Sequence, residues 1–410
     1  MPSTPPQTPV FDKGRKPDLN ATTNSLFDVS TFNSTTLDED DTLNENKDQN
    51  PYYSPTSPVA LSEFLPFSCD KKEPQEQKTP TTSFSYDRYP LKSERLRNFV
   101  LSSSVFHIRL VDRLGKGTNS YVFEAIMSSQ GGSELEVAVK IPVSRSRVKS
   151  LERETEFMLL LKNFRLNSNE NSDTFPFVIP YGLYYLNRES FVMMRKRDEL
   201  PCLVMKKMDC TLTDYIRVCG KSALPEHIVI SEELWWYLCG VLLHALRILR
   251  VLSSVHCDLK TDNVLVSLQK NSCSLQFKVS DFSSSSRVED MDSMLETTPQ
   301  FAPPELLNTG DPLARACTQT DLFSCGLILL NAATGKAPYQ AYSYDQFYMI
   351  SLVKENKALE LLDRESINIL RKNTAISQLI HMIVKDRCTL DSAVDYFHQH
   401  QNLGTLHVAL

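Results

Sequence analysis

The sequence lacks the cysteine spacing that binds zinc or builds a disulfide framework. Its ten cysteines stand singly, with no Cys-x-x-Cys pair and no histidine at zinc-finger spacing. Reduced, unpaired thiols are typical of proteins of the cytoplasm and nucleus. We therefore expect an intracellular protein without structural zinc.

The sequence also lacks a dominant charge and a clear membrane span. A net charge of −6 over 410 residues is small, which argues against a nucleic-acid or anionic-membrane partner. The longest apolar region, residues 234–252, is interrupted by charged side chains such as Arg247 and Arg250, so we expect no membrane span there. The first residues lack the basic and apolar segments of a secretory signal.

The first 97 residues have the composition of a disordered tail. They are rich in Ser, Thr, Pro, Asn and Asp and show neither strand nor helix periodicity, so they cannot bury enough apolar area to fold. Five Ser/Thr-Pro pairs occur there: Thr4-Pro5, Thr8-Pro9, Ser54-Pro55, Ser57-Pro58 and Thr79-Pro80.

These pairs favour a regulatory tail. An extended chain with Ser/Thr-Pro suits a proline-directed kinase, although both residue types are simply abundant in disordered tails. Thr4 and Thr8 are spaced to form one doubly phosphorylated acidic patch. Such a patch suits an Arg-lined recognition site, for example that of a ubiquitin-ligase adaptor.

Strand-like runs begin near Phe106 and give way to helical spacing. Short apolar runs separated by Gly and Ser indicate strands joined by hairpins. A helical pattern follows after Leu151, then two more strand-like runs, and beyond Glu232 the apolar spacing is mainly helical. The sequence predicts an α+β fold in which a β-rich lobe with one main helix precedes a larger helical lobe.

A glycine-containing hairpin, Gly115-Lys116-Gly117-Thr118-Asn119-Ser120-Tyr121-Val122, is the first candidate for nucleotide binding. Its two glycines let the main chain approach phosphates closely, and Val122 suits an apolar roof over a purine. Alone the pattern is weak, because a glycine hairpin without a ligand is the commoner case.

Lys140, at the end of the apolar run Val137-Ala138-Val139, is the second candidate. A buried ammonium is unfavourable unless an anion meets it, so we expect a phosphate and a carboxylate partner. Glu154 is the expected carboxylate, because apolar residues at i+3, i+4 and i+7 place it on the inward face of the next helix. Glu152 and Glu156 are expected on the solvated face.

Asp258, Lys260 and Asn263 form the most specific pattern. They lie in a loop between a helix and an apolar strand, and they suit proton acceptance, phosphate neutralisation and Mg²⁺ binding respectively. Asp281 ends the next strand, in Phe277-Lys278-Val279-Ser280-Asp281-Phe282-Ser283, and suits a second contact to the metal. We expect these residues to form one site.

With these motifs the chain resembles the eukaryotic protein kinases, and a lysine two residues after the expected base resembles their Ser/Thr type. The resemblance extends through Thr298–Glu305, which stands where the family has its Ala-Pro-Glu segment. It implies a two-lobed kinase domain at 98–400, with an N-lobe at about 98–208 and a C-lobe at about 209–400, followed by a tail at 401–410. One budding-yeast member is similar in its Ser-Thr-Pro-Pro start and its Ile179–Leu183 strand.

The resemblance implies transfer of the γ-phosphate of ATP, with Mg²⁺, to a Ser or Thr hydroxyl of a protein substrate. Asp258 would be the base, Lys260 would contact the γ-phosphate, and Lys140 would pair with the α/β-phosphates and Glu154. Asn263 and Asp281 would hold Mg²⁺. The nucleotide would contact Leu114, Gly115, Gly117, Ser120, Val122, Ala138, Lys140, Met205, Lys206 and Met208.

Met205 would gate the back of the nucleotide pocket. Lys206, Lys207 and Met208 would form the hinge that reads the adenine. Other residues would be structural: Glu305 would pair with Arg387, and Asp321 would anchor the catalytic loop.

Two residues depart from the family pattern. Cys257 replaces the arginine that usually precedes the catalytic aspartate and binds a phosphate on the activation loop, so we expect activity without loop phosphorylation. Ser283 replaces the glycine after Asp281-Phe282 and restricts the main chain there. A pseudokinase-like scaffold with weak or no catalysis therefore stays an alternative. Phosphorylation of a small molecule is less favoured, because Thr298–Glu305 resembles a peptide platform.

Overall fold

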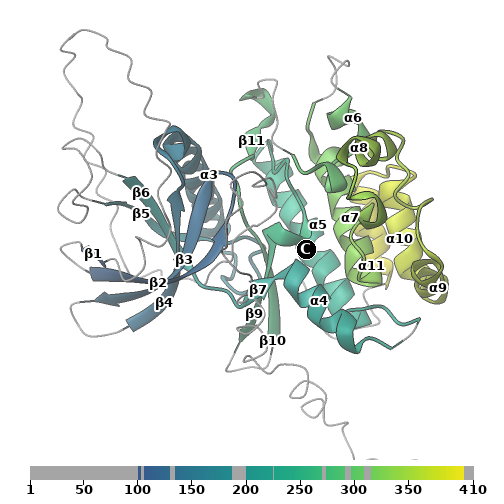
Figure 1. The fold of residues 1–410 in the computed structure, drawn as a ribbon, viewed down its shortest axis with the longest axis horizontal. Coiled ribbons are helices and arrows are strands. Elements are labelled where there is room, and N and C mark those ends of the chain that lie inside the picture. The colour runs from purple at the N-terminus through teal and green to yellow at the C-terminus, as the bar shows by residue number, and fades with distance from the viewer. Residues whose placement is uncertain are drawn as a thin grey trace, which may run out of the picture. The chain divides into compact units, whose positions relative to one another are not determined.

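The computed structural model describes residues 100–102, 106–129, 134–186, 200–224, 226–269, 274–290, 297–308 and 315–400. In this part of the chain a β-rich lobe is followed by a larger helical lobe (Figure 1). The predicted two-lobed α+β fold is confirmed. The predicted tails at 1–97 and 401–410 lie outside the described residues and stay predictions.

The first lobe is built on a six-stranded antiparallel sheet in the order β1-β2-β3-β4-β6-β5. The register of β4 and β6 places Ala138 opposite Met205 and Lys140 opposite Leu203. The strands are β1 (Val100–Ser102), β2 (Phe106–Lys116), β3 (Ser120–Ser129), β4 (Glu134–Pro142), β5 (Pro180–Leu186) and β6 (Leu200–Lys206).

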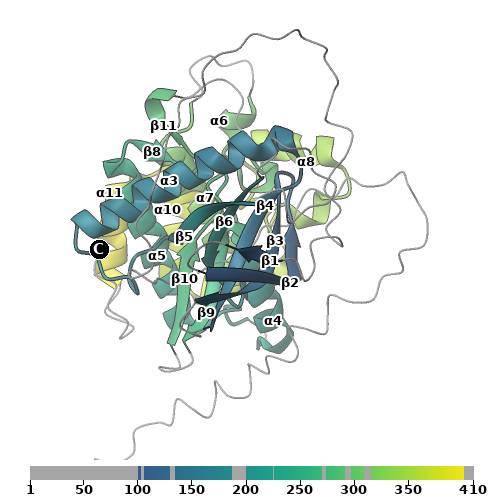
Figure 2. The ribbon, with the colours of Figure 1, turned by 90° about the vertical axis from the view of Figure 1, so that its left-hand side faces the viewer.

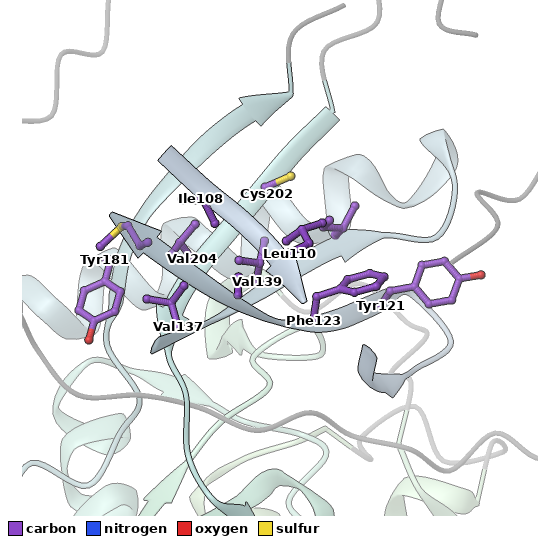
Figure 3. Close-up of a cluster of buried hydrophobic side chains, with 12 residues drawn as sticks. Ile108, Leu110, Tyr121, Phe123, Val137, Val139, Tyr181, Cys202 and Val204 are labelled. Carbon is purple, nitrogen blue, oxygen red and sulfur yellow. The ribbon is translucent and has the colours of Figure 1, made fainter. Parts of the chain in front are cut away.

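Alternating side chains of this sheet form the core of the first lobe (Figure 3). Val137 and Val139 of β4 pack with Ile108 of β2 and Val204 of β6, and all four are buried. Because successive side chains of a strand point to opposite faces, Ala138 and Lys140 face away from this core. The alternation therefore directs Lys140 toward the second face of the sheet.

One helix, α3 (Val148–Asn167), packs against β4, β5 and β6 (Figure 2). Its buried residues recur three and four positions apart, which is the spacing of one helix face. Glu154 is among them, whereas Glu152 and Glu156 are not buried, as predicted. The face consists of Leu151, Glu154, Thr155, Phe157, Met158, Leu161 and Arg165.

The second lobe is built around two buried helices, α5 (Glu232–Val251) and α7 (Thr318–Thr334). The hydroxyl of Ser231 caps α5 by accepting from the Leu234 N–H, and Gly335 caps the C-terminal end of α7 with a φ of 75°, which suits glycine. The other helices are α4 (Leu212–Ser222), α6 (Pro304–Leu307), α8 (Gln346–Lys354), α9 (Arg364–Lys372), α10 (Thr374–Val384) and α11 (Leu390–His400).

By length and composition α5 is apolar enough to cross a membrane, alone among the described helices. Most of its apolar side chains are buried within the second lobe, however. Trp235 and Trp236 are both buried, and Trp235 Nε1 donates to the carbonyl of Leu329 in α7 at 2.9 Å. Burial within the lobe accounts for the composition of this helix.

Short strands position the loops that carry the candidate site. β9 (Val264–Gln269) and β10 (Ser274–Val279) pair antiparallel, with Val264 opposite Val279. This register places Asn263 beside Ser280, whose N–H donates to the Asn263 carbonyl at 2.8 Å. The remaining short strands are β7 (Cys210–Thr211), β8 (Ser254–Val255) and β11 (Ser286–Arg287).

Candidate active site

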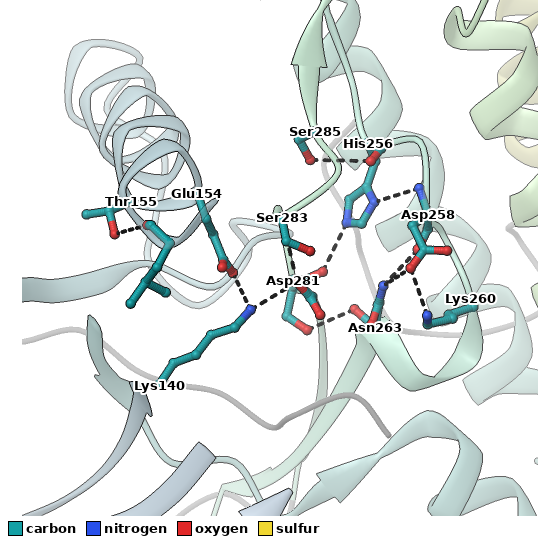
Figure 4. A network of polar contacts seen from close by, with 12 residues as sticks. Lys140, Glu154, Thr155, His256, Asp258, Lys260, Asn263, Asp281, Ser283 and Ser285 are labelled. Carbon is teal, nitrogen blue, oxygen red and sulfur yellow. Dashed lines mark hydrogen bonds and ion pairs between the residues drawn. The ribbon is translucent and has the colours of Figure 1, made fainter. Parts of the chain in front are cut away.

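Lys140, Glu154 and Asp281 meet in a buried charge cluster (Figure 4). Lys140 Nζ lies 2.7 Å from Glu154 Oε1 and 3.0 Å from Asp281 Oδ1, and Lys140 is only 3% exposed. The three side chains come from β4, from α3 and from the segment after β10, so the cluster joins the two lobes. The sequence predicted the pairing of Lys140 with Glu154, and the structure brings them together.

Electrostatics keep Lys140 and Asp281 of this cluster charged, whereas burial raises the pKa of Glu154 to about 7 against the opposing attraction of Lys140. Burial alone would lower the pKa of Lys140, but attraction to Asp281 and Glu154 outweighs it and raises that pKa. Burial alone would raise the pKa of Asp281, yet Lys140 holds it well below its usual range. An ammonium and a carboxylate are thus fixed side by side at neutral pH.

Packing of Phe282 fixes the turn that follows Asp281. Its ring contacts those of Phe157 in α3, Phe177 and His256, at centroid distances of 5.4, 5.8 and 5.3 Å. Asp281 has φ 58°, a left-handed conformation that is unfavourable for a residue with a side chain. The enclosed ring holds this turn, which directs the Asp281 carboxylate toward Lys140.

Asp258 is held through both carboxylate oxygens. Lys260 Nζ lies 2.7 Å from Oδ2, and the N–H of Thr298 donates to Oδ1 at 2.8 Å. Lys260 Nζ also donates to Thr298 Oγ1 at 2.8 Å. Sequence reasoning named Thr298 only as the start of the peptide-platform segment. It missed this bridge because no local pattern signals a contact between residues so far apart in the chain.

Asp321 of α7 anchors the loop that carries Asp258, as predicted. Its Oδ2 accepts from the His256 N–H at 2.7 Å and its Oδ1 accepts from the Cys257 N–H at 3.0 Å. Burial raises the pKa of Asp321, while the His256 and Cys257 N–H groups oppose the shift. Cys257 has φ 69°, so these bonds hold a strained turn next to Asp258.

Asn263 has an unused acceptor that fits a metal ligand. It is fully buried, and its Nδ2 donates to the Asp258 carbonyl at 2.7 Å, while its Oδ1 has no hydrogen-bond partner. A buried, unpaired carbonyl oxygen is rare in proteins and suits a hard cation. The carboxylate of Asp281 extends from the end of the neighbouring strand.

Asn263 and Asp281 are suitable ligands for the predicted Mg²⁺. In the described part of the chain no three His, Cys, Asp or Glu side chains gather as a metal site. Mg²⁺ commonly takes only one or two protein ligands and completes its shell with water and substrate phosphates. The structure thus supplies a donor set suited to that ion.

The predicted nucleotide-binding residues lie on the sheet and on its connection to the second lobe. In the β2/β3 hairpin Gly115 is opposite Val122, and the Gly117 N–H donates to the Ser120 carbonyl at 2.8 Å. Leu114, in β2, is 38% exposed.

Ala138 lies opposite Met205 in the β4/β6 pair, Lys206 ends β6, and Met205 and Met208 are buried. Lys207 lies between Lys206 and Met208 in the sequence. Its Nζ is 2.5 Å from Glu124 Oε1, and this contact connects the predicted hinge to β3. The roles of all these residues in nucleotide binding stay predictions.

Glu305 and Arg387 form an ion pair, as predicted. The guanidinium of Arg387 also lies over the ring of Phe323 in α7, 4.6 Å from its centroid. This contact ties the segment Thr298–Glu305 to the helical core of the second lobe.

The side chain of Cys257 packs in an apolar cluster. Val255, Cys257 and Ala316 are buried together, with Leu306 packed against them. Burial raises the pKa of the Cys257 thiol, so it carries no charge at neutral pH. Apolar contacts therefore take the place where the family pattern has an arginine.

Comparisons with known proteins agree with this geometry. Serine/threonine-protein kinase ISR1 of Saccharomyces cerevisiae is 27% identical over 234 residues, which cover 55% of this chain and 51% of that protein. ISR1 of Eremothecium gossypii is 29% identical over 235 residues, covering 57% of this chain and 60% of that protein. Serine/threonine-protein kinase 33 of Bos taurus is 25% identical over 338 residues, which cover 74% of this chain and 61% of that protein.

The chain thus matches about half to three fifths of the length of these relatives. The expected resemblance to Ser/Thr-type kinases, including a budding-yeast member, is confirmed. The model of the family described as "Protein kinase domain" matches residues 108–398, well over half of the chain. The chain belongs to the protein kinase domain family.

Proposed function

We propose that the chain is a serine/threonine protein kinase that uses Mg·ATP. The observation that carries the proposal is the fixed carboxylate of Asp258, held by Lys260 and Thr298 beside the cluster of Lys140 and Asp281. The names of the related proteins support the Ser/Thr acceptor class. All the residue types that the proposed reaction needs are therefore present, which argues against the scaffold alternative.

In the proposed reaction the substrate hydroxyl oxygen bonds to the γ-phosphorus of ATP. The bond from that phosphorus to the β–γ bridging oxygen breaks, and ADP leaves. Asp258 accepts the hydroxyl proton, and Lys260 offsets the negative charge of the transferred group. Because Thr298 and Lys260 hold both Asp258 oxygens, the base needs little reorganisation in the transfer.

Lys140, Asp281 and Asn263 would bind the phosphates and the metal. Bound Mg²⁺ supplies charge neutralisation of the phosphate oxygens, and Asp281 and the unpaired Oδ1 of Asn263 would hold it. Lys140 would contact the phosphates, while Glu154 orients its ammonium at 2.7 Å. These residues bind and orient, and Asp258 moves the proton.

The proposal includes activity without activation-loop phosphorylation. The apolar cluster around Cys257 supports it. The Cys257 side chain packs with Val255, Ala316 and Leu306, so the loop that carries Asp258 has no arginine at position 257 to bind a phosphate. In place of a phosphate contact, Asp321 and Thr298 hold this loop. A purified, phosphatase-treated chain should work at a rate within about threefold of the loop-phosphorylated chain, and a gain of tenfold or more on phosphorylation would refute this part.

Phosphoamino-acid analysis tests the main proposal. The purified chain would be incubated with Mg²⁺, γ-labelled ATP and a generic protein acceptor, with Asp258→Asn as the control. We expect label on Ser or Thr from the wild type and at least about a hundredfold less from the variant. Equal label from both would favour the pseudokinase-like scaffold.

We also propose that phosphorylation and turnover through the tail control the amount of this intracellular kinase. The support is the sequence alone, in the pairs Thr4-Pro5 and Thr8-Pro9. A proline-directed kinase and then a ubiquitin-ligase adaptor would act on them. Thr4→Ala with Thr8→Ala should lengthen the protein half-life, with Thr79→Ala as the matched control, and an unchanged half-life would count against the idea.

A further inference from the structure

Lys278 is a buried lysine that the proposed reaction does not use. It lies on β10, three residues before Asp281, and is only 3% exposed. Its Nζ donates to the main-chain carbonyls of Ser172 at 3.0 Å, of Asp173 at 2.9 Å and of Phe175. An ammonium has three N–H donors, so these three carbonyls can take up all of them.

The three carbonyls belong to the segment that joins α3 to β5. Main-chain hydrogen bonds extend the same connection, from the Val279 N–H to the Pro176 carbonyl at 2.7 Å and from the Val178 N–H to the Val279 carbonyl at 3.0 Å. The helix α3 carries Glu154, and β10 leads to Asp281. Lys278 therefore lies where the elements that supply both partners of Lys140 meet.

A lysine is electrostatically unfavourable at this place. Burial, together with the cations of Lys206 and Arg165, lowers the pKa of Lys278 to about 7, although Asp173 opposes the shift. An apolar side chain would avoid this penalty but would leave three buried carbonyls without Lys278 as a donor. The hydrogen-bonding capacity of the side chain, and not its volume, is what this position uses.

We propose that Lys278 is a positioning residue for phosphate transfer, which holds the α3–β5 connection against β10 and thereby sets the distance from Glu154 to Lys140. The inference rests on the proposed kinase function. Loss of the three hydrogen bonds would weaken the attachment of the α3–β5 connection to β10, and the main-chain bonds of Val279 with Pro176 and Val178 would remain. The pair of Lys140 and Glu154 would then loosen, while Asp281 would stay in place through its own strand.

The variant Lys278→Met tests this role, because it keeps an unbranched side chain only one heavy atom shorter and removes its donors. Gln276→Met is the matched control. Gln276 lies two residues earlier on β10, so it is on the same strand face, and it is also buried. Lys278→Gln keeps two N–H donors and should give an intermediate result.

The measurements are kcat and KM for Mg·ATP, thermal unfolding, and amide hydrogen exchange of α3. For Lys278→Met we expect kcat to fall at least about tenfold with KM changed less than about threefold. Exchange in α3 should become at least about tenfold faster, with α7 unchanged. Gln276→Met should keep kcat within about twofold and leave α3 exchange as in the wild type.

A merely structural lysine predicts a different result. The proposal would be overturned if Lys278→Met had lower thermal stability but the kcat of the wild type, with kcat normalised to the protein that binds nucleotide. It would also be overturned if amide exchange in α3 of this variant matched the wild type. If Lys278→Met does not fold, Lys278→Gln is judged by the same measurements. If the wild type transfers no phosphate, the proposed function has failed, and exchange in α3 still decides whether Lys278 holds the connection.

Discussion

Asp258 and Thr298, forty residues apart in the chain, are joined by a 2.8 Å hydrogen bond from the Thr298 N–H to Asp258 Oδ1. The Thr298 hydroxyl accepts a second bond from Lys260 at 2.8 Å. The residue that starts the peptide-platform segment thus touches both the proposed base and the lysine beside it. In the proposed reaction, substrate binding at this segment and proton transfer at Asp258 would therefore share one hydrogen-bond network.

Thr298→Val should lower kcat for a Ser/Thr peptide about 10- to 100-fold, because Lys260 loses an acceptor and its position beside Asp258. Thr298→Ser keeps the hydroxyl and should retain most of the rate. Steady-state kinetics of both variants check this. Equal rates for the Val and Ser variants would show that the hydroxyl has no part in the reaction.

Burial raises the pKa of Glu154 to about 7, so the comparison is made at pH 8, where the carboxylate predominates. There Glu154→Gln should lower kcat about 10- to 100-fold, because a neutral amide orients the Lys140 ammonium less strongly than a carboxylate. Glu156→Gln is the matched control, since Glu156 lies on the exposed face of the same helix. Initial rates at saturating Mg·ATP measure both. Similar losses in the two variants would contradict the assigned pairing.

Asn263→Ala should raise the Mg²⁺ concentration for half-maximal rate about 10- to 100-fold, because the unpaired Oδ1 is removed from the metal site. Asn263→Asp, which retains an oxygen at that position, should shift it less. A Mg²⁺ titration of the rate at fixed ATP is the measurement. An unchanged titration for the Ala variant would rule out Asn263 as a ligand.

The pair of Glu305 and Arg387 should stabilise the second lobe by about 1 to 2 kcal/mol, since the contact is charge-assisted and only partly exposed. A double-mutant cycle of Glu305→Gln and Arg387→Met, followed by urea unfolding, measures this coupling. Arg387→Met alone should cost more than Glu305→Gln alone, because it also removes the contact with Phe323. Additive effects of the two changes would contradict the prediction.

His244 should make the protein less stable as the pH falls. Burial lowers its pKa to about 4 in the folded protein, helped by Arg247 and Lys278, although Glu170 Oε2 lies 3.6 Å from His244 Nε2. In the unfolded chain the pKa is about 6.5. Between these values the unfolded state binds more protons, so the free energy of unfolding falls with decreasing pH.

Urea unfolding of the wild type and of His244→Gln at pH 7, 6 and 5 tests this. The difference in unfolding free energy, wild type minus variant, should decline by about 1 kcal/mol per pH unit below pH 6.5. A difference that stays constant would show that His244 is protonated equally in both states.

Local patterns in the sequence suffice to predict part of the site. Helix periodicity places Glu154 on the inner face of α3, and strand alternation places Lys140 opposite the core. The spacing of Asp258, Lys260 and Asn263 lies within one loop, so a short motif defines it. These residues could be predicted because each signal depends on neighbours close in the chain.

The contacts of Thr298 and Lys278 could not be predicted in the same way. Thr298 meets Lys260 across 38 residues, and Lys278 meets the carbonyl of Phe175 across 103. Both contacts arise from packing between elements, and the acceptors of Lys278 are main-chain carbonyls, which carry no residue-type signal. In β10 polar and apolar residues alternate, so the sequence places Lys278 on the polar side of the strand with Gln276 and does not indicate that it is buried.

The rate of γ-phosphate transfer by Asp258→Asn, compared with the wild type at equal nucleotide occupancy, tests the proposed function most directly. We predict that the variant binds Mg·ATP with an affinity within about threefold of the wild type and transfers phosphate at least about a hundredfold more slowly. Transfer at the wild-type rate by the variant, or none by either protein, would contradict the assignment of Asp258 as the base of a protein kinase.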